Sequence, residues 1–318
     1  MKMRNVTVIA ISLATTTGCM HGQKQADRQQ PAGAVEIDSN VAQATTTPEV
    51  ARPTAPQEAE HPLNHVERGD KLIGEGVLTS DSLRTGKIED FVVDQGSGQI
   101  LYAIVGIGGV LGVGETRLAV PPGVFSDAKP GMVQTTVDKP KFTSAPQMPK
   151  AADQVDAKYL SSVYGYFGQP ATWQRTSPSP QATFPNARKV SEIMGMKVVN
   201  SAHQDLGKVE SVVLDVPGGL ELYVVISPST EMNLGNNYYA IPPKALQLSP
   251  DQIGLVSDLN HEKLSNAPHF AKDDWSELSN TTWAQKDYQY FGQAFPTGGL
   301  VPTGRTGGNT TKVYPKQK

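Results

Sequence analysis

The feature that most constrains this 318-residue chain is an internal repeat that needs no gap across its first part. Residues 73–105 align with residues 194–226, and every matched pair lies 121 positions apart, as Gly86 and Gly207 do. Later landmarks recur with small insertions, among them YGYFGQ at 164–169 and YQYFGQ at 288–293. Such a period indicates one structural unit of about 100 residues that is used twice, and we expect each unit to have its own core.

Each unit has the pattern of a small β-structure built around a hairpin. Residues 87–94 and 99–105 are rich in β-branched and aromatic residues, and the QGSG between them is a turn signal. In the second of these segments the odd-numbered and the even-numbered residues form two apolar faces, so both faces are expected to be covered. Short strands near Val77 and at 118–120, stopped by Pro121, would complete a closed or nearly closed barrel.

A polar stretch and a helix are expected after each barrel. In the second unit Asp274 and Glu277 resemble a capping box in front of the helix, and the first unit's helix is predicted over residues 152–167. These helices carry most of the large aromatic residues, which predicts packing against their own barrel or, alternatively, a docking surface for a partner. The candidates for partner contact in the helices are Tyr164, Tyr166, Phe167, Tyr288, Tyr290 and Phe291.

The first unit has GKIED leading into a strand, the strand YAIV, a glycine-rich hairpin and a closing AVPP. With these motifs residues 71–122, and again 190–243, resemble the PRC-barrel domain, named for the cytoplasmic barrel of the photosynthetic reaction centre H subunit. The second unit lacks most of the hairpin glycines. The resemblance implies binding modules without chemistry of their own. The predicted fold is all-β with appended helices: two tandem small PRC-type β-barrels joined by a flexible linker.

The stretch GIGGVLGVGE at 106–115 has five glycines but is not a nucleotide site. Phosphate-binding glycines precede a helix, often with a lysine, and neither follows here. In the second unit only Gly114 persists, as Gly235. We therefore predict a flexible hairpin tip and no cofactor. Its apolar residues could touch a membrane surface or a partner, and they are Val110, Leu111 and Val113.

The N-terminus has the order of an export signal. The basic residues Lys2 and Arg4 precede an apolar run at 6–14, which is shorter than the roughly 20 residues that span a bilayer. TTGC at 16–19 resembles a bacterial lipobox, although Thr16 stands where leucine is commonest, and this implies lipidation of Cys19. An ordinary signal peptide is the alternative. With Met20 after the cysteine, the resemblance favours the outer membrane, facing the periplasm.

Composition divides the whole chain into six segments. They are a lipoprotein-type signal peptide at 1–18, a disordered tether at 19–66, the first unit with its helix at 67–173, a linker at 174–187, the second unit with its helix at 188–295, and a disordered tail at 296–318. The tether, rich in Gln, Ala, Thr and Pro, has a reach of about 35 to 40 Å. It would hold the folded units clear of lipid head groups.

Charge and spacing argue against several kinds of chemistry. A net charge of -3 and a pI near 6.1 give no field that attracts nucleic acid, and a single cysteine allows no internal disulfide. Glu89 with Asp94, repeated as Glu210 with Asp215, is the best carboxylate pair. Five residues along a strand separate the two acids by roughly 17 Å, too far for paired acid–base work. They are expected to bind solvent or cap a turn.

The histidines and nearby acids of the second unit lack the spacing of a metal site. They are His203, Asp205, His261, Glu262, His269 and Asp273, and none has an equivalent of the same type in the first unit. We therefore expect no metal site, no catalytic residues and no enzyme. The predicted function is a non-catalytic, envelope-anchored scaffold or adaptor that binds protein partners. The alternative, implied by the similarity to the reaction centre H subunit barrel, is an accessory or assembly factor of a photosynthetic or electron-transfer membrane complex. The export signal argues against a role in ribosome assembly.

Overall fold

The computed structural model describes residues 63, 65–108, 115–129, 131–149, 156–171, 173 and 184–296. All of them belong to one compact unit, Ala55–Lys318. The lipidation candidate Cys19 and the hairpin-tip residues Val110, Leu111 and Val113 lie outside the described residues. Within the described part, no helix is both long enough and apolar enough to cross a membrane.

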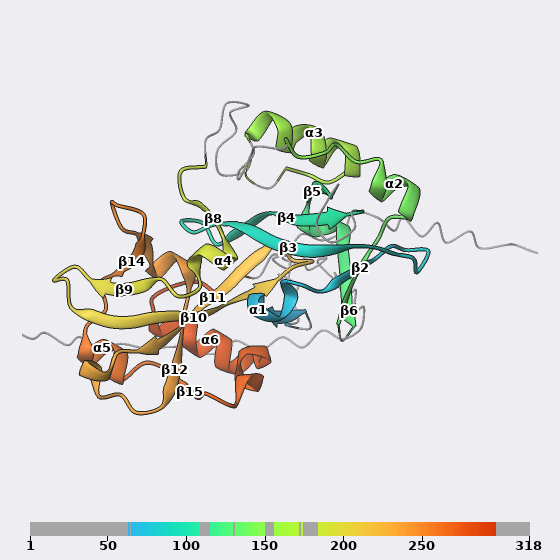
Figure 1. Ribbon diagram of the computed structural model, residues 1–318. Helices are drawn as coiled ribbons and strands as arrows, with labels where there is room; N and C mark the ends of the chain where they lie inside the picture. The colour runs from blue at the N-terminus through green and yellow to red at the C-terminus, as the bar shows by residue number, and fades with distance from the viewer. Residues whose placement is uncertain are drawn as a thin grey trace, which may run out of the picture. The chain divides into compact units, whose positions relative to one another are not determined.

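The two repeats contain nearly the same elements in the same order (Figure 1). The first consists of β1 (Val66–Arg68), α1 (Gly69–Leu72), β2 (Gly76–Leu78), β3 (Arg84–Asp94), β4 (Gln99–Ile107), β5 (Thr116–Val120), the 3-10 turn η1 (Pro122–Val124), β6 (Phe125–Lys129), β7 (Met132–Thr135), α2 (Lys139–Thr143) and α3 (Ala157–Phe167). The second consists of β8 (Ala187–Lys189), α4 (Val190–Ile193), β9 (Lys197–Asn200), β10 (Asp205–Asp215), β11 (Leu220–Pro228), η3 (Thr230–Met232), β12 (Asn237–Ile241), η4 (Pro243–Ala245), β13 (Gln247–Leu248), β14 (Gly254–Ser257), α5 (His261–Ser265), β15 (Phe270–Ala271), η5 (Trp275–Ser279) and α6 (Thr281–Tyr290). The predicted hairpins and short strands are thus present in both repeats.

The two C-terminal helices begin later than the sequence analysis expects. Helix α6 begins after Asn280, whose side chain accepts a hydrogen bond from the Trp283 amide at 3.2 Å. Asp274 instead caps the short turn η5 by accepting from the Ser276 amide, so the helix start predicted there is wrong. In the first repeat, Asp156 caps α3 through the Tyr159 amide at 2.7 Å. Asp and Asn side chains both suit the N-cap position of a helix. In the second repeat the downstream residue of the two, Asn280, is the one at which α6 begins.

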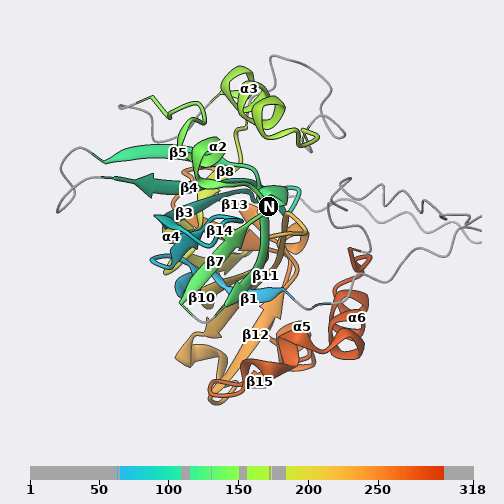
Figure 2. The same cartoon turned by 90° about the vertical axis from the view of Figure 1, so that its right-hand side faces the viewer.

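The repeats exchange their first strands. Strand β1 of the first repeat pairs antiparallel with β10 of the second (Figure 2). Strand β8 of the second repeat pairs antiparallel with β3 of the first (Figure 1). A further pairing, between Leu220 and Gln99, joins the two hairpins, so that one 15-stranded sheet runs through both repeats. The all-β class with appended helices is confirmed. Along the main order of paired strands, from β13 to β6, the two end strands do not pair with each other. Among the described strands, therefore, neither repeat forms a closed barrel by itself.

The apolar core has three parts, and this corrects the expectation of a separate core in each unit. The central cluster contains residues of both repeats, such as Ile100 and Phe91 with Val224 and Leu255. Two outer clusters lie beneath α3 and α6. Each is built mainly from one repeat, but Ala187 of β8 joins the cluster under α3, and Val66 of β1 packs against the cluster under α6. Because each open sheet leaves its inner face uncovered, the two inner faces bury one another. The outer helices cover the remaining faces, as the sequence analysis favours.

A β-bulge in each central hairpin changes which residues of the second strand lie on each face of the sheet, compared with the odd–even alternation expected from the sequence. In the β3–β4 ladder Val92 pairs with Tyr102 and Val93 pairs with Ile100, which leaves Leu101 as the extra residue. Leu101 therefore joins Tyr102 in the outer cluster, while Ile100 turns to the central cluster. The bulge frees the Leu101 carbonyl, which accepts from the Tyr164 hydroxyl of α3 at 2.7 Å.

The second repeat has the same bulge and the same tyrosine contact. Leu222 is the extra residue there, and its carbonyl accepts from the Tyr288 hydroxyl of α6 at 2.6 Å. The aligned glycines also lie in matching places: a methyl group on Gly86 would lie 2.6 Å from the Gly106 carbonyl oxygen, and one on Gly207 would lie 2.1 Å from that of Ser227. The neighbouring strand passes too close for any side chain at either position.

Candidate functional site

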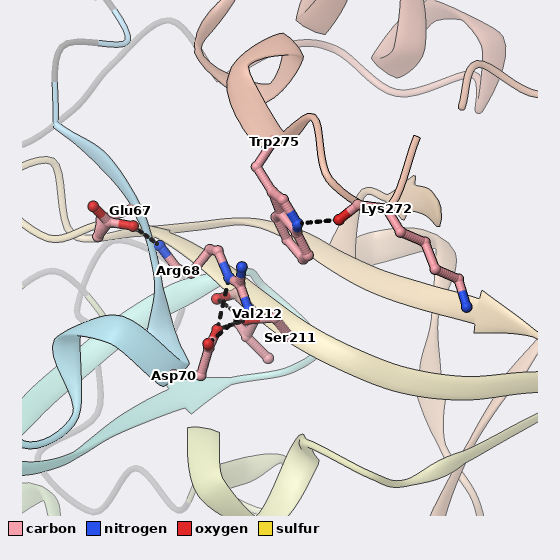
Figure 3. A network of polar contacts seen from close by, with 7 residues as sticks. All are labelled: Glu67, Arg68, Asp70, Ser211, Val212, Lys272 and Trp275. Atoms are coloured by element: carbon pink, nitrogen blue, oxygen red, sulfur yellow. Dashed lines mark hydrogen bonds and ion pairs between the residues drawn. The ribbon is translucent and has the colours of Figure 1, made fainter. Parts of the chain in front are cut away.

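A network of polar contacts joins the two repeats, and we call it the inter-repeat clasp (Figure 3). Arg68 forms a bidentate ion pair with Asp70 at 2.9 and 2.7 Å. The Arg68 guanidinium also lies 3.9 Å from the ring centre of Trp275, which belongs to the second repeat. Asp70 accepts a further hydrogen bond from the Ser211 hydroxyl of β10 at 2.6 Å. The clasp thus holds β1 and α1 on the second repeat through charge-assisted bonds and a cation–π contact.

A reciprocal contact holds the start of the second repeat on the first. The Ser191 amide donates to Asp90 at 3.2 Å, and the Ser191 hydroxyl donates to the same carboxylate. Ser191 aligns with Asp70, and Asp90 aligns with Ser211. In the clasp the short helix supplies the acid and the central strand supplies the hydroxyl, whereas in this second contact the helix supplies the hydroxyl and the strand supplies the acid. Burial raises the pKa of Asp90, and the two bonds from Ser191 partly offset that rise.

Two buried acids distinguish the second repeat from the first. Glu221 occupies the position of Ile100 and is 2% exposed, and Asp287 occupies the position of Val163 and is fully buried. Burial raises the pKa of Glu221 to about 8, and the nearby Asp94 carboxylate adds to the rise. The Gln95 amide offsets it partly, without forming a hydrogen bond of normal geometry. Burial likewise raises the pKa of Asp287 to about 8.

The six aromatic candidates for partner contact divide into interior and accessible side chains. Tyr164, Phe167 and Tyr288 are buried in the core and offer no free surface to a partner. Tyr166 and Phe291 are partly exposed, and Tyr290 is 39% exposed. The hydroxyl groups of Tyr166 and Tyr290 donate to the carbonyls of the aligned residues Lys141 and Lys263. This contact ties the end of each long helix to α2 or α5.

Tyr290 and Phe291 line a cavity of about 460 Å³, called here the second-repeat cavity. Its wall is formed by η4, β13, β14, α5 and the residues around the end of α6. The lining residues are Lys244, Ala245, Gln247, Val256, Ser257, Asp258, Leu259, Lys263, Tyr290, Phe291 and Gln293. Ligand pockets commonly enclose about 300 to 1,000 Å³ and combine apolar walls with a few polar groups, and this cavity has both properties.

Larger side chains occupy the aligned region of the first repeat. Phe142, which aligns with Leu264, packs against Phe167 with ring centres 6.4 Å apart. Gln169 lies over Gly123, where an added methyl group would be 2.5 Å from its side-chain oxygen. In the second repeat the residue aligned with Gly123 is Lys244, so the same covering position is not open to the glutamine. The side chains that border the cavity thus differ from those at the aligned positions of the first repeat.

Of the four carboxylates considered in the sequence, the two aspartates cap turns, one in each hairpin. Asp94 accepts from the Gly96 amide at 3.2 Å and from the Ser97 hydroxyl at 2.9 Å, and Asp215 accepts from the Gly218 amide at 3.0 Å. This confirms turn capping as their role.

A different carboxylate pair was missed by the sequence analysis. A methyl group on Gly106 would meet Glu115 at 2.3 Å and Glu89 at 2.4 Å, so these two side chains flank the same glycine. Burial, followed by the charge of Glu115, raises the pKa of Glu89. The two acids lie 26 positions apart. Glu89 is on β3 and Glu115 directly precedes β5, and they meet because both strands pair with β4. No signal in the sequence links them.

The histidines and acids that the sequence analysis tested for metal binding are dispersed. His203 lies in a turn, Asp205 forms an ion pair with Lys197 at 3.0 Å, and His269 packs on the ring of Tyr239 at 5.4 Å. His261, Glu262 and Asp273 are exposed. Within the described ranges, no three His, Cys, Asp or Glu side chains form a group that could hold a metal ion.

Comparison with known proteins agrees with the observed duplication. The PRC-barrel domain matches residues 64–141 and again residues 185–259. No curated protein matches the chain. Each match begins with the strand that is exchanged and includes the central hairpin, and the aligned bulges and glycines described above lie within both. The chain therefore carries two tandem copies of the PRC-barrel domain.

Proposed function

We propose that the protein is a non-catalytic scaffold or adaptor, anchored in the cell envelope, that binds protein partners through its two PRC-barrel domains. The observation that carries this proposal is the reciprocal exchange of first strands between the domains. Two domains locked in this way present their outer surfaces at a fixed spacing. A partner assembly that contacts both surfaces gains from that preorganisation, because less freedom is lost on binding.

The accessible aromatic residues are the proposed contact points. Tyr290 and Phe291 in the second domain, and Tyr166 in the first, remain at the surface after the helices have packed on their own domains. Aromatic side chains that combine apolar area with a polar tip are enriched at protein interfaces. The second domain is the better candidate, since its aromatic residues border an open cavity.

Capture of partners from membranes tests the scaffold role. The full-length protein and its Tyr290→Ala variant would be crosslinked in cells and purified, with Tyr166→Ala as the matched variant in the first domain. We expect a reproducible set of partners that Tyr290→Ala loses while its melting temperature stays close to that of the parent. Absence of any reproducible partner, or identical sets from all three proteins, would contradict the proposal.

Anchoring requires a separate experiment. The mass of the mature N-terminus in membrane fractions is expected to correspond to a chain that begins at Cys19 and carries lipid. A Cys19→Ala variant should then leave the membrane fraction. An unmodified N-terminus, or a variant that stays in the membrane fraction, would remove the lipid anchor from the proposal without affecting the scaffold role.

A further inference from the structure

Lysines outnumber acids in the lining of the second-repeat cavity, by two to one. Lys244 and Lys263 both line it and are exposed, whereas Asp258 is the one acidic residue in its lining. Neither lysine forms an ion pair with another residue in the described part of the chain. The Lys263 ammonium group has only a long contact of 3.5 Å to the Asp258 carbonyl. Both cations are therefore free to meet an anion.

The walls below these lysines are largely apolar. Ala245, Val256 and Leu259 supply aliphatic surface, and Phe291 supplies an aromatic ring. Leu259 is buried, while Val256 and Phe291 keep part of their surface open. An occupant would thus exchange water for apolar contacts inside the cavity and for charge-assisted bonds at its rim.

The first domain provides an internal comparison. At the positions aligned with Lys244 and Ala245 it has Gly123 and Val124, so it lacks one of the two cations and has the larger aliphatic side chain. Lys141 aligns with Lys263, and the next residue, Phe142, packs against Phe167. In the second domain the extra lysine therefore lies at the rim of the open volume.

We propose that the second-repeat cavity binds a small organic anion, a carboxylate attached to an apolar body about the size of a fused aromatic ring pair. The apolar body would lie against Val256, Leu259 and Phe291. The carboxylate would lie at the rim, within reach of Lys244 and Lys263. This binding needs no protein partner, and so it does not depend on the scaffold role.

Three probes with the same ring system and different charge test the inference on the full chain. They are 1-naphthoate, the neutral 1-naphthalenemethanol and the cationic 1-naphthylmethylammonium, with binding measured by titration calorimetry at low salt. We expect 1-naphthoate to bind most tightly and the cation most weakly. Equal binding of the three, or no binding of 1-naphthoate, would overturn the proposal.

Variants then locate the site. Lys263→Gln and Lys244→Gly, the second of which installs the residue of the first domain, should each weaken 1-naphthoate about two- to fivefold and leave the neutral probe unchanged. Lys141→Gln is the matched control in the first domain and should change nothing. Ala245→Val should weaken both probes by narrowing the cavity. If the Lys263→Gln and Lys141→Gln variants behave alike, the anion binds elsewhere and the inference fails.

Discussion

Replacing Glu221 by glutamine should change how the stability of the protein depends on pH. The carboxyl group is 2% exposed, and both of its oxygens lack a hydrogen-bond partner among the described residues. Glutamine has nearly the shape of the protonated acid and cannot ionise. The variant therefore removes one titration and preserves the packing.

The direction of the pH effect follows from comparing the protonation of Glu221 in the folded and the unfolded protein. Below pH 4.5 the Glu221 carboxyl is neutral whether the protein is folded or unfolded. As the pH rises towards 8, the unfolded chain releases this proton and the folded protein keeps it, so the free energy of unfolding falls. Above pH 8 the folded protein also releases the proton, and the loss levels off.

The magnitude follows from the shift of the pKa from 4.5 to about 8. One proton of difference changes the free energy of unfolding by about 1.4 kcal/mol for each pH unit. Between pH 5 and pH 8, Glu221 is thus expected to cost the wild-type protein about 3 to 4 kcal/mol. Relaxation around the buried carboxylate reduces this value rather than increasing it.

Urea unfolding at several pH values between 5 and 9 measures the effect. The difference in unfolding free energy between Glu221→Gln and the wild type should grow with pH in favour of the variant. Glu231→Gln removes an exposed acid and serves as the control, with no comparable trend. Glu221→Ile, which installs the residue of the first domain, should behave like Glu221→Gln. A Glu221→Gln difference that is constant with pH would refute the argument.

Three further predictions concern the packing between and within the domains, each measured by urea unfolding. Ser191→Ala should lower the free energy of unfolding by about 1 to 3 kcal/mol, because Asp90 loses its hydroxyl donor. The double variant Asp90→Ser, Ser191→Asp restores an acid–hydroxyl pair and should recover most of that stability. A double variant as unstable as the worse of Asp90→Ser and Ser191→Asp alone would contradict this. Gly69→Ala should cost about 1 to 3 kcal/mol, since the added carbon would lie 2.6 Å from a Val190 methyl group, and Val190→Ala should relieve that cost. Tyr288→Phe should cost about 1 kcal/mol by removing the bond to the bulge carbonyl, and an unchanged stability would show that the bond contributes nothing.

Several properties of this protein were determined by the sequence alone. The duplication, the two central hairpins with their turns, and the matches to the PRC-barrel domain all follow from patterns within short segments. The capping of turns by Asp94 and Asp215 could also be predicted. These features depend on neighbours a few residues away, so composition and spacing contain the information.

Other properties were decided only by the tertiary structure. Val66–Arg68 and Ala187–Lys189 lie where the predicted tether and linker pass into the first and second units. Each nevertheless forms a strand that pairs with the other domain, because strand pairing depends on partners more than 90 residues away. The same holds for Glu221, which the sequence analysis did not single out. It is buried beside the β3–β4 turn of the first domain, where its amide donates to the Gly98 carbonyl. The cavity likewise depends on which aligned side chains meet across β14, α5 and α6. Local periodicity sets each strand and helix, whereas the surfaces that remain open are set by what the elements pack against.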